Sequence, residues 1–95
     1  MKNIDIDLNG QIIKGIEIKF SKAPLVLAKA KSGFVMCGYL NLETAEKLGD
    51  AAAVVRGVMT VEDLLKAKIQ GFTSFAAQKG VKEGMTGKEA LEKMG

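Results

Sequence analysis

Cys37 is the residue with the clearest potential for nucleophilic chemistry, because a thiolate can attack an electrophile or bind a metal. A catalytic thiol usually needs a neighbouring base, and the chain contains no histidine to serve as one. With one cysteine and no histidine, the sequence also offers few ligands for a metal. The pattern favours Cys37 as a small buried residue of a packed hairpin, with a functional thiol as the alternative. We expect no bound metal and no cofactor.

Arg56 is the only arginine of the chain, and it stands in an otherwise apolar run. A guanidinium group can bind a carboxylate or a phosphate through two parallel hydrogen bonds. Arg56 is therefore a candidate for binding a small anion. An ion pair at an interface, or a side chain whose stem packs at a strand end, would explain the residue equally well.

The segment made of Thr86, Gly87 and Lys88 is a second candidate anion site. Thr86 and Glu89 have the spacing of a capping box, so a helix should begin here, and the N–H groups at a helix start attract anions. An ordinary capped helix is the simpler interpretation. The glycines of the chain do not form a phosphate-binding loop, because no glycine pair is followed by Lys-Ser or Lys-Thr at the required spacing.

The composition limits the classes of partner. The chain has 95 residues, with 14 basic and 11 acidic side chains and a net charge of +3. The lysines are interleaved with acids, and the clustered arginines of nucleic-acid surfaces are lacking, so we do not expect nucleic-acid binding. The N-terminal residues lack the apolar core of a signal peptide, and no apolar run approaches the roughly 18 residues of a membrane span. These features predict a cytoplasmic protein that does not bind membranes.

Residues 1–40 are predicted to form antiparallel strands. Apolar residues alternate over 4–8, and Asn9-Gly10 is a strong signal for a hairpin turn. A two-residue turn would place most apolar residues of the second strand beside the acids of the first. The pattern therefore favours a three-residue, bulged loop that pairs Leu8 with Ile12 and joins the two apolar rows.

A second hairpin is predicted around Ser32-Gly33, with a two-residue turn that places Ala28 opposite Cys37. Both faces of the strands are mostly apolar, as in a sheet that is covered on both sides. A short chain can cover one face with its own helices, and the other face would remain a large exposed patch. We therefore expect residues 1–40 to drive homo-oligomerisation.

Residues 41–95 have a helical periodicity that short strands interrupt, one of them expected over 52–58. Capping residues mark the ends of the predicted helices, with Asn41, Thr60 and Thr86 as N-caps and Gly49 and Gly80 as stops. Strands followed by alternating helices and strands indicate an α+β fold. We expect a single domain over residues 1–95, with one sheet and its helices on one face.

Three segments of the chain together resemble the YunC-like family of small bacterial and archaeal proteins, a domain of unknown function. They are Gly33–Leu40 (GFVMCGYL), Gly57–Leu65 (GVMTVEDLL) and Gly80–Leu91 (GVKEGMTGKEAL). The resemblance covers almost the whole chain, with the three motifs in the order of the family. It implies an N-terminal β region that forms a tetramer, and it implies no activity and no catalytic residue.

The sequence thus favours a cytoplasmic, homo-oligomeric and non-catalytic binding or scaffold module, with a small anionic metabolite as its candidate ligand. The alternative is an enzyme that uses Cys37 or Arg56 at a subunit interface. The lack of histidine and of any cluster of acids favours the first interpretation.

Overall fold

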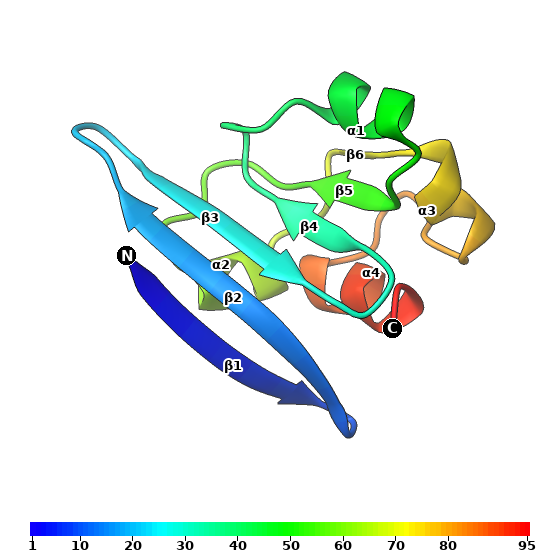
Figure 1. Cartoon of the computed structure of the whole chain (residues 1–95), viewed down its shortest axis with the longest axis horizontal. Helices are drawn as coiled ribbons and strands as arrows, with labels where there is room; N and C mark the ends of the chain where they lie inside the picture. Colours follow the sequence, from blue (N-terminus) through cyan, green and yellow to red (C-terminus); the bar gives the residue numbers. More distant parts are fainter.

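A computed structural model describes all residues from 1 to 95 as one six-stranded mixed sheet with four helices (Figure 1). The elements follow one another as β1 (Lys2–Leu8), β2 (Gln11–Lys19), β3 (Pro24–Lys29), β4 (Phe34–Met36), α1 (Leu42–Leu48), β5 (Ala52–Val54), α2 (Val61–Lys66), β6 (Gly71–Phe72), α3 (Ser74–Gln78) and α4 (Gly87–Lys93). The strands lie in sequence order, and only β4 and β5 run parallel. The prediction of an α+β fold is confirmed.

The β1–β2 hairpin has a two-residue turn, so the bulged loop expected from the sequence is wrong. Asn9 and Gly10 both have positive φ, 55° and 86°. A type I′ turn, whose twist matches that of the two strands, requires positive φ at both of its central residues. Leu8 therefore pairs with Gln11 rather than Ile12. The physical reason is Ile13, which is 0% exposed and points into the core with the apolar row of β1.

The β3–β4 hairpin also differs from its predicted register, by two residues. Ala28 pairs with Val35 rather than Cys37, and a four-residue turn closes with a hydrogen bond from the Ala30 N–H to the Gly33 carbonyl oxygen, at 2.8 Å. A slip of two residues leaves every side chain on its original face. Cys37 therefore still lies on the same face as Ala28, although β4 itself ends at Met36.

The main core lies between one face of the sheet and the helices α2, α3 and α4. We call this the inner face; its buried side chains include Ile13, Val26, Val35, Ala53 and Val55. In Figure 1 the strands β2 and β3 pass in front of α2, which packs against their inner face. All N-caps predicted from the sequence are confirmed, with Asn41, Thr60 and Thr86 each accepting backbone N–H bonds.

Helix α1 lies on the opposite, outer face, whereas the sequence led us to expect all helices on one face. Its Leu42 approaches Gly71 next to Val54, whose side chain points away from the main core. The reason is that α1 links the parallel strands β4 and β5, and a right-handed crossover fixes the side of the sheet on which such a helix lies. No helix of the chain is both long and apolar enough to span a membrane.

Candidate functional site

The carboxyl ends of β4 and β5 lie at the same edge of the sheet, because these two strands are parallel and adjacent (Figure 1). Cys37 and Gly38 directly follow β4, and Arg56 and Gly57 follow β5 after one more residue. In sheets with parallel strands, ligands commonly bind in the crevice outside these ends. The fold thus brings two candidates from different parts of the sequence, Cys37 and Arg56, to one edge.

The guanidinium group of Arg56 lies against the backbone of Gly38. A β-carbon at Gly38 would come within 2.9 Å of Arg56 Nη1, so the glycine allows this approach. The side chain is exposed, and the two ion pairs of the chain, Lys14–Asp5 and Lys66–Glu62, do not include it. Arg56 borders an open pocket of about 410 Å³ beside the start of α1. The pocket is therefore bordered by a positive charge without a carboxylate partner.

Backbone donors surround the same edge. The N–H groups of Gly38, Tyr39, Arg56 and Gly57 donate to no backbone carbonyl of the chain. At α1, by contrast, the first donors are in use, because Asn41 Oδ1 accepts from the N–H groups of the first turn. Gly38, Tyr39 and Arg56 border the pocket beside Arg56 and could offer their N–H groups to an anion there, whereas Gly57 lines the Cys37 pocket.

Cys37 lies at this edge but borders a different pocket. Its side chain is 5% exposed, and Sγ accepts a hydrogen bond from the Val26 N–H at 3.3 Å. The pocket next to it, of about 360 Å³, is also lined by Pro24 and by residues 57–59. The pockets of Cys37 and Arg56 meet only at Gly38 and Tyr39. The two predicted residues are close in the fold but do not face one common cavity.

The Thr86–Lys88 segment belongs to the contact between α2 and α4. Thr86 and Glu89 form the expected capping box, with the Glu89 N–H donating to Thr86 Oγ1 at 3.3 Å. The Gly87 N–H donates to the Ala67 carbonyl oxygen at 2.8 Å, and a β-carbon at Gly87 would overlap the Leu64 carbonyl oxygen. Several donors that an anion would need are thus already engaged within the protein.

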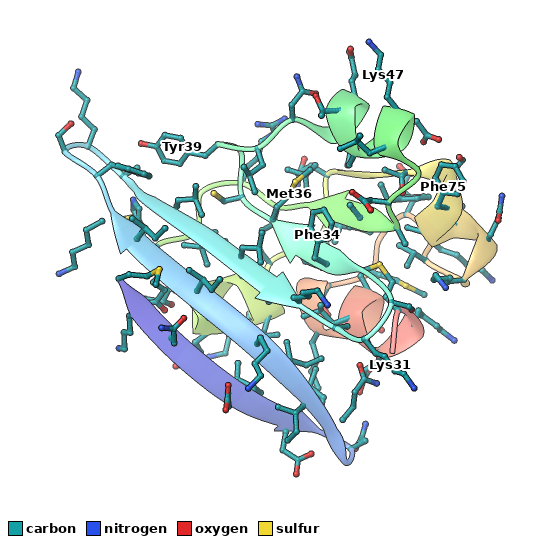
Figure 2. All side chains as sticks on the ribbon, viewed as in Figure 1. Lys31, Phe34, Met36, Tyr39, Lys47 and Phe75 are labelled. Carbon is teal, nitrogen blue, oxygen red and sulfur yellow. The ribbon has the colours of Figure 1, made fainter.

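One further groove, around the β2–β3 turn, was not predicted from the sequence. Phe20 and Tyr39 pack with ring centroids 5.3 Å apart, and the Tyr39 hydroxyl donates to the Ala23 carbonyl oxygen at 3.1 Å. Figure 2 shows Tyr39 extending from the loop after β4 toward this turn. The groove has a volume of about 480 Å³ and shares Pro24 and Met59 with the Cys37 pocket. Only the folded chain brings these segments together.

Acidic groups do not assemble into a site. No three histidine, cysteine, aspartate or glutamate side chains are grouped as metal ligands. The pKa of Glu46 is lowered by hydrogen bonds from the hydroxyl group and the backbone N–H of Ser74. This carboxylate therefore links α1 to α3 and has a structural role.

Comparison with known proteins identifies the family and supports the fold of the chain. The family model described as "Domain of unknown function (DUF1805)" matches residues 36–94. The Bacillus subtilis protein named "Uncharacterized protein YunC" is 33% identical over 93 residues, which cover 94% of this chain and 92% of the relative. The crystal structure of a protein of unknown function from Thermoplasma acidophilum is 34% identical, with a TM-score of 0.93 over 99% of this chain and 92% of the other. The resemblance to the YunC-like family is thereby confirmed, and the chain belongs to the DUF1805 family.

Proposed function

We propose that the protein is a cytoplasmic, homo-oligomeric and non-catalytic module that binds a small anionic metabolite beside Arg56. The observation that carries this proposal is the guanidinium group of Arg56, which lies against Gly38 at the carboxyl ends of two parallel strands with no carboxylate partner. In open α/β sheets, ligands commonly bind outside the carboxyl ends of parallel strands.

The chemistry of the edge favours a carboxylate or a phosphate. A guanidinium group offers two parallel N–H bonds to either, and hydrogen bonds between charged groups are the stronger kind. The N–H groups of Gly38 and Tyr39, which donate to no backbone carbonyl and belong to residues that border the same pocket, can contact the remaining oxygens. The exposed carboxylate of Glu43 borders the same pocket and could compete for the guanidinium group. The ligand must therefore bind Arg56 more strongly than Glu43 does.

The anion site is tested by thermal unfolding with inorganic phosphate, pyrophosphate, citrate and succinate, each compared with sodium chloride at equal ionic strength. At least one anion should raise the Tm in a saturable way, because a ligand that binds only the folded state stabilises it. The Arg56→Gln variant should lose this rise. The Lys88→Gln variant should keep it, and it also tests the second candidate position at the start of α4.

The anion proposal is wrong if no member of this set raises the Tm beyond the effect of chloride. It is also wrong if Arg56→Gln responds as the wild type does. A response that Lys88→Gln loses and Arg56→Gln keeps would move the site to the start of α4. Circular dichroism of both variants before ligand addition confirms that they are folded.

The homo-oligomer is supported by the outer face of β1–β3, which α1 does not cover. Ile12, Ile16, Ile18 and Leu27 lie on this face, and Ile12 is 53% exposed. Asp5 and Asp7 of β1 lie on the same face beside the apolar row, with Lys29 of β3 on its other side. Lys14 lies in the same row and forms an ion pair with Asp5 of its own chain at 3.0 Å. A second copy packed about a two-fold axis would cover the isoleucines on either side of this ion pair and could pair Asp7 with Lys29.

Light scattering at micromolar concentration tests the assembly. We expect a mass of about four times the 10.1 kDa of one chain, the tetramer that the family resemblance implies. Ile16→Lys should reduce this mass, because it replaces a central isoleucine of the covered face with a charge that has no partner. Leu48→Lys, an exposed position on α1, is the matched control and should leave the mass unchanged. A wild-type particle of 10.1 kDa would refute the proposed assembly.

An enzyme that uses Cys37 is the second candidate function. It is favoured by one contact, the hydrogen bond that Cys37 Sγ accepts from the Val26 N–H beside an open pocket. A functional thiol should react with a thiol reagent such as 5,5′-dithiobis-(2-nitrobenzoic acid) in the folded protein. Reaction only after unfolding would leave Cys37 as a core residue and would exclude this second function.

A further inference from the structure

The groove around the β2–β3 turn, described above, combines apolar walls with a basic rim. Its apolar wall includes Phe20, Pro24 and Met59, and its rim carries Lys2, Lys19 and Lys22. Phe20 and Met59 are 50% and 57% exposed, which is unusual for large apolar side chains that lie together. We call it the lysine-rimmed groove. Its volume of about 480 Å³ is in the range of small-molecule sites.

The charges of the groove are unequal. Glu17 is the only acidic residue among those that line it, and its Oε2 accepts a hydrogen bond from the Val61 N–H at 2.8 Å. The carboxylate is thus directed to the start of α2. The three lysines, by contrast, take part in no ion pair of the chain. The groove therefore complements a negative charge attached to an apolar body.

We infer that the lysine-rimmed groove binds a small amphiphilic anion, a carboxylate with an extended alkyl chain. The chain of the ligand would lie on Met59 and Pro24, and the Phe20–Tyr39 pair would close one end of the apolar wall. The carboxylate would remain near the solvent, beside Lys19 and Lys22. Lysine suits this role, because its ammonium group is a flexible point charge whose aliphatic stem can also cover the ligand. The site is separate from the proposed anion site at Arg56.

Titration calorimetry with dodecanoate, below its critical micelle concentration, tests the inference. Dodecanoate should bind saturably, whereas butyrate, which lacks the apolar body, and dodecyltrimethylammonium, which has the opposite charge, should bind at least tenfold more weakly. Met59→Glu should weaken dodecanoate binding at least tenfold, because it places a carboxylate on the apolar wall. Leu48→Glu introduces the same change at an exposed position on α1 and should leave the affinity unchanged.

A second variant separates charge from packing. Lys19→Gln combined with Lys22→Gln keeps the apolar wall and should weaken dodecanoate binding severalfold, with a smaller dependence on salt. Arg56→Gln should leave dodecanoate binding unchanged. The two proposed sites are thus tested separately, and a negative result at one does not count against the other. Circular dichroism confirms the fold of each variant.

Three results would overturn the inference. Equal binding of dodecyltrimethylammonium would reduce the groove to a nonspecific apolar surface. If the wild type binds no dodecanoate and Met59→Glu lowers the particle mass measured by light scattering, the groove is instead a contact between copies of the chain. Co-sedimentation with phosphatidylglycerol vesicles that Met59→Glu abolishes, without binding of free dodecanoate, would identify a membrane surface instead.

Discussion

The carboxylate of Glu17 in β2 caps α2, accepting a hydrogen bond from the Val61 N–H at 2.8 Å across 44 positions of the sequence. Thr60 caps the same helix by accepting from the Asp63 N–H. A short helix has little stability of its own, so these bonds help to hold α2 against the sheet. Glu17 thus couples the N-terminal hairpin to the helical part of the chain.

Glu17→Ala should lower the free energy of unfolding by about 0.5–2 kcal/mol, the usual cost of losing a capping side chain. Chemical denaturation with urea measures this change. Lys19→Ala, on the same side of the same strand, is the control and should change the stability much less. Equal urea midpoints for Glu17→Ala and the wild type would show that the long-range cap contributes nothing.

Thr73 is the only buried polar residue of the chain, and it is 1% exposed. Its hydroxyl donates to the Asp50 carbonyl oxygen at 2.8 Å and accepts from the Ala52 and Ala76 N–H groups. Thr73→Val keeps the shape but leaves these backbone groups without their partner. The unfolding free energy should fall by about 1–3 kcal/mol. Thr44→Val on the exposed side of α1 is the control, and a similar small effect in both variants would contradict this role.

The parts of the fold that the sequence predicted are those set by local chemistry. Asn41, Thr60 and Thr86 were recognised as N-caps because a cap and the donors it satisfies lie within a few residues of each other. The register of the first hairpin was not recognised. Ile12 and Ile13 are adjacent, apolar and on opposite faces, so the sequence does not reveal which of them the distant helices will cover.

The candidate site was predicted in its residues but not in its arrangement. Composition alone singled out Cys37 and Arg56, as the only cysteine and the only arginine. Their separate pockets depend on the parallel pairing of β4 and β5, which is a long-range contact. The lysine-rimmed groove was missed because its walls come from the β2–β3 turn and from Met59, and neither segment has a binding motif of its own.

Gly33 occupies a position with no room for a side chain. A β-carbon there would lie within 2.7 Å of the Ala51 carbonyl oxygen and would overlap the side chain of Met94. Gly33→Ala must therefore displace the turn before β4 away from Ala51 and Met94, at a cost of about 1–3 kcal/mol. Thermal and urea unfolding measure this loss, with the exposed neighbour Lys31→Ala as control. A Gly33→Ala protein as stable as the wild type would show that this contact relaxes freely.

Glu46 should make the stability depend on pH, because the Ser74 hydroxyl and N–H bind its ionised form and lower its pKa in the folded protein. A carboxyl group whose pKa is lower in the folded state stabilises the fold fully above its unfolded pKa. That stabilisation is lost as the pH falls through the lower, folded value. Glu46→Gln should therefore have a lower Tm than the wild type at pH 7, and the difference should shrink toward pH 3. Glu83→Gln changes an exposed carboxylate with no hydrogen bond to the protein, so it controls for the loss of one charge. A Tm difference for Glu46→Gln that is the same at both pH values would contradict the contribution of the ionised carboxylate.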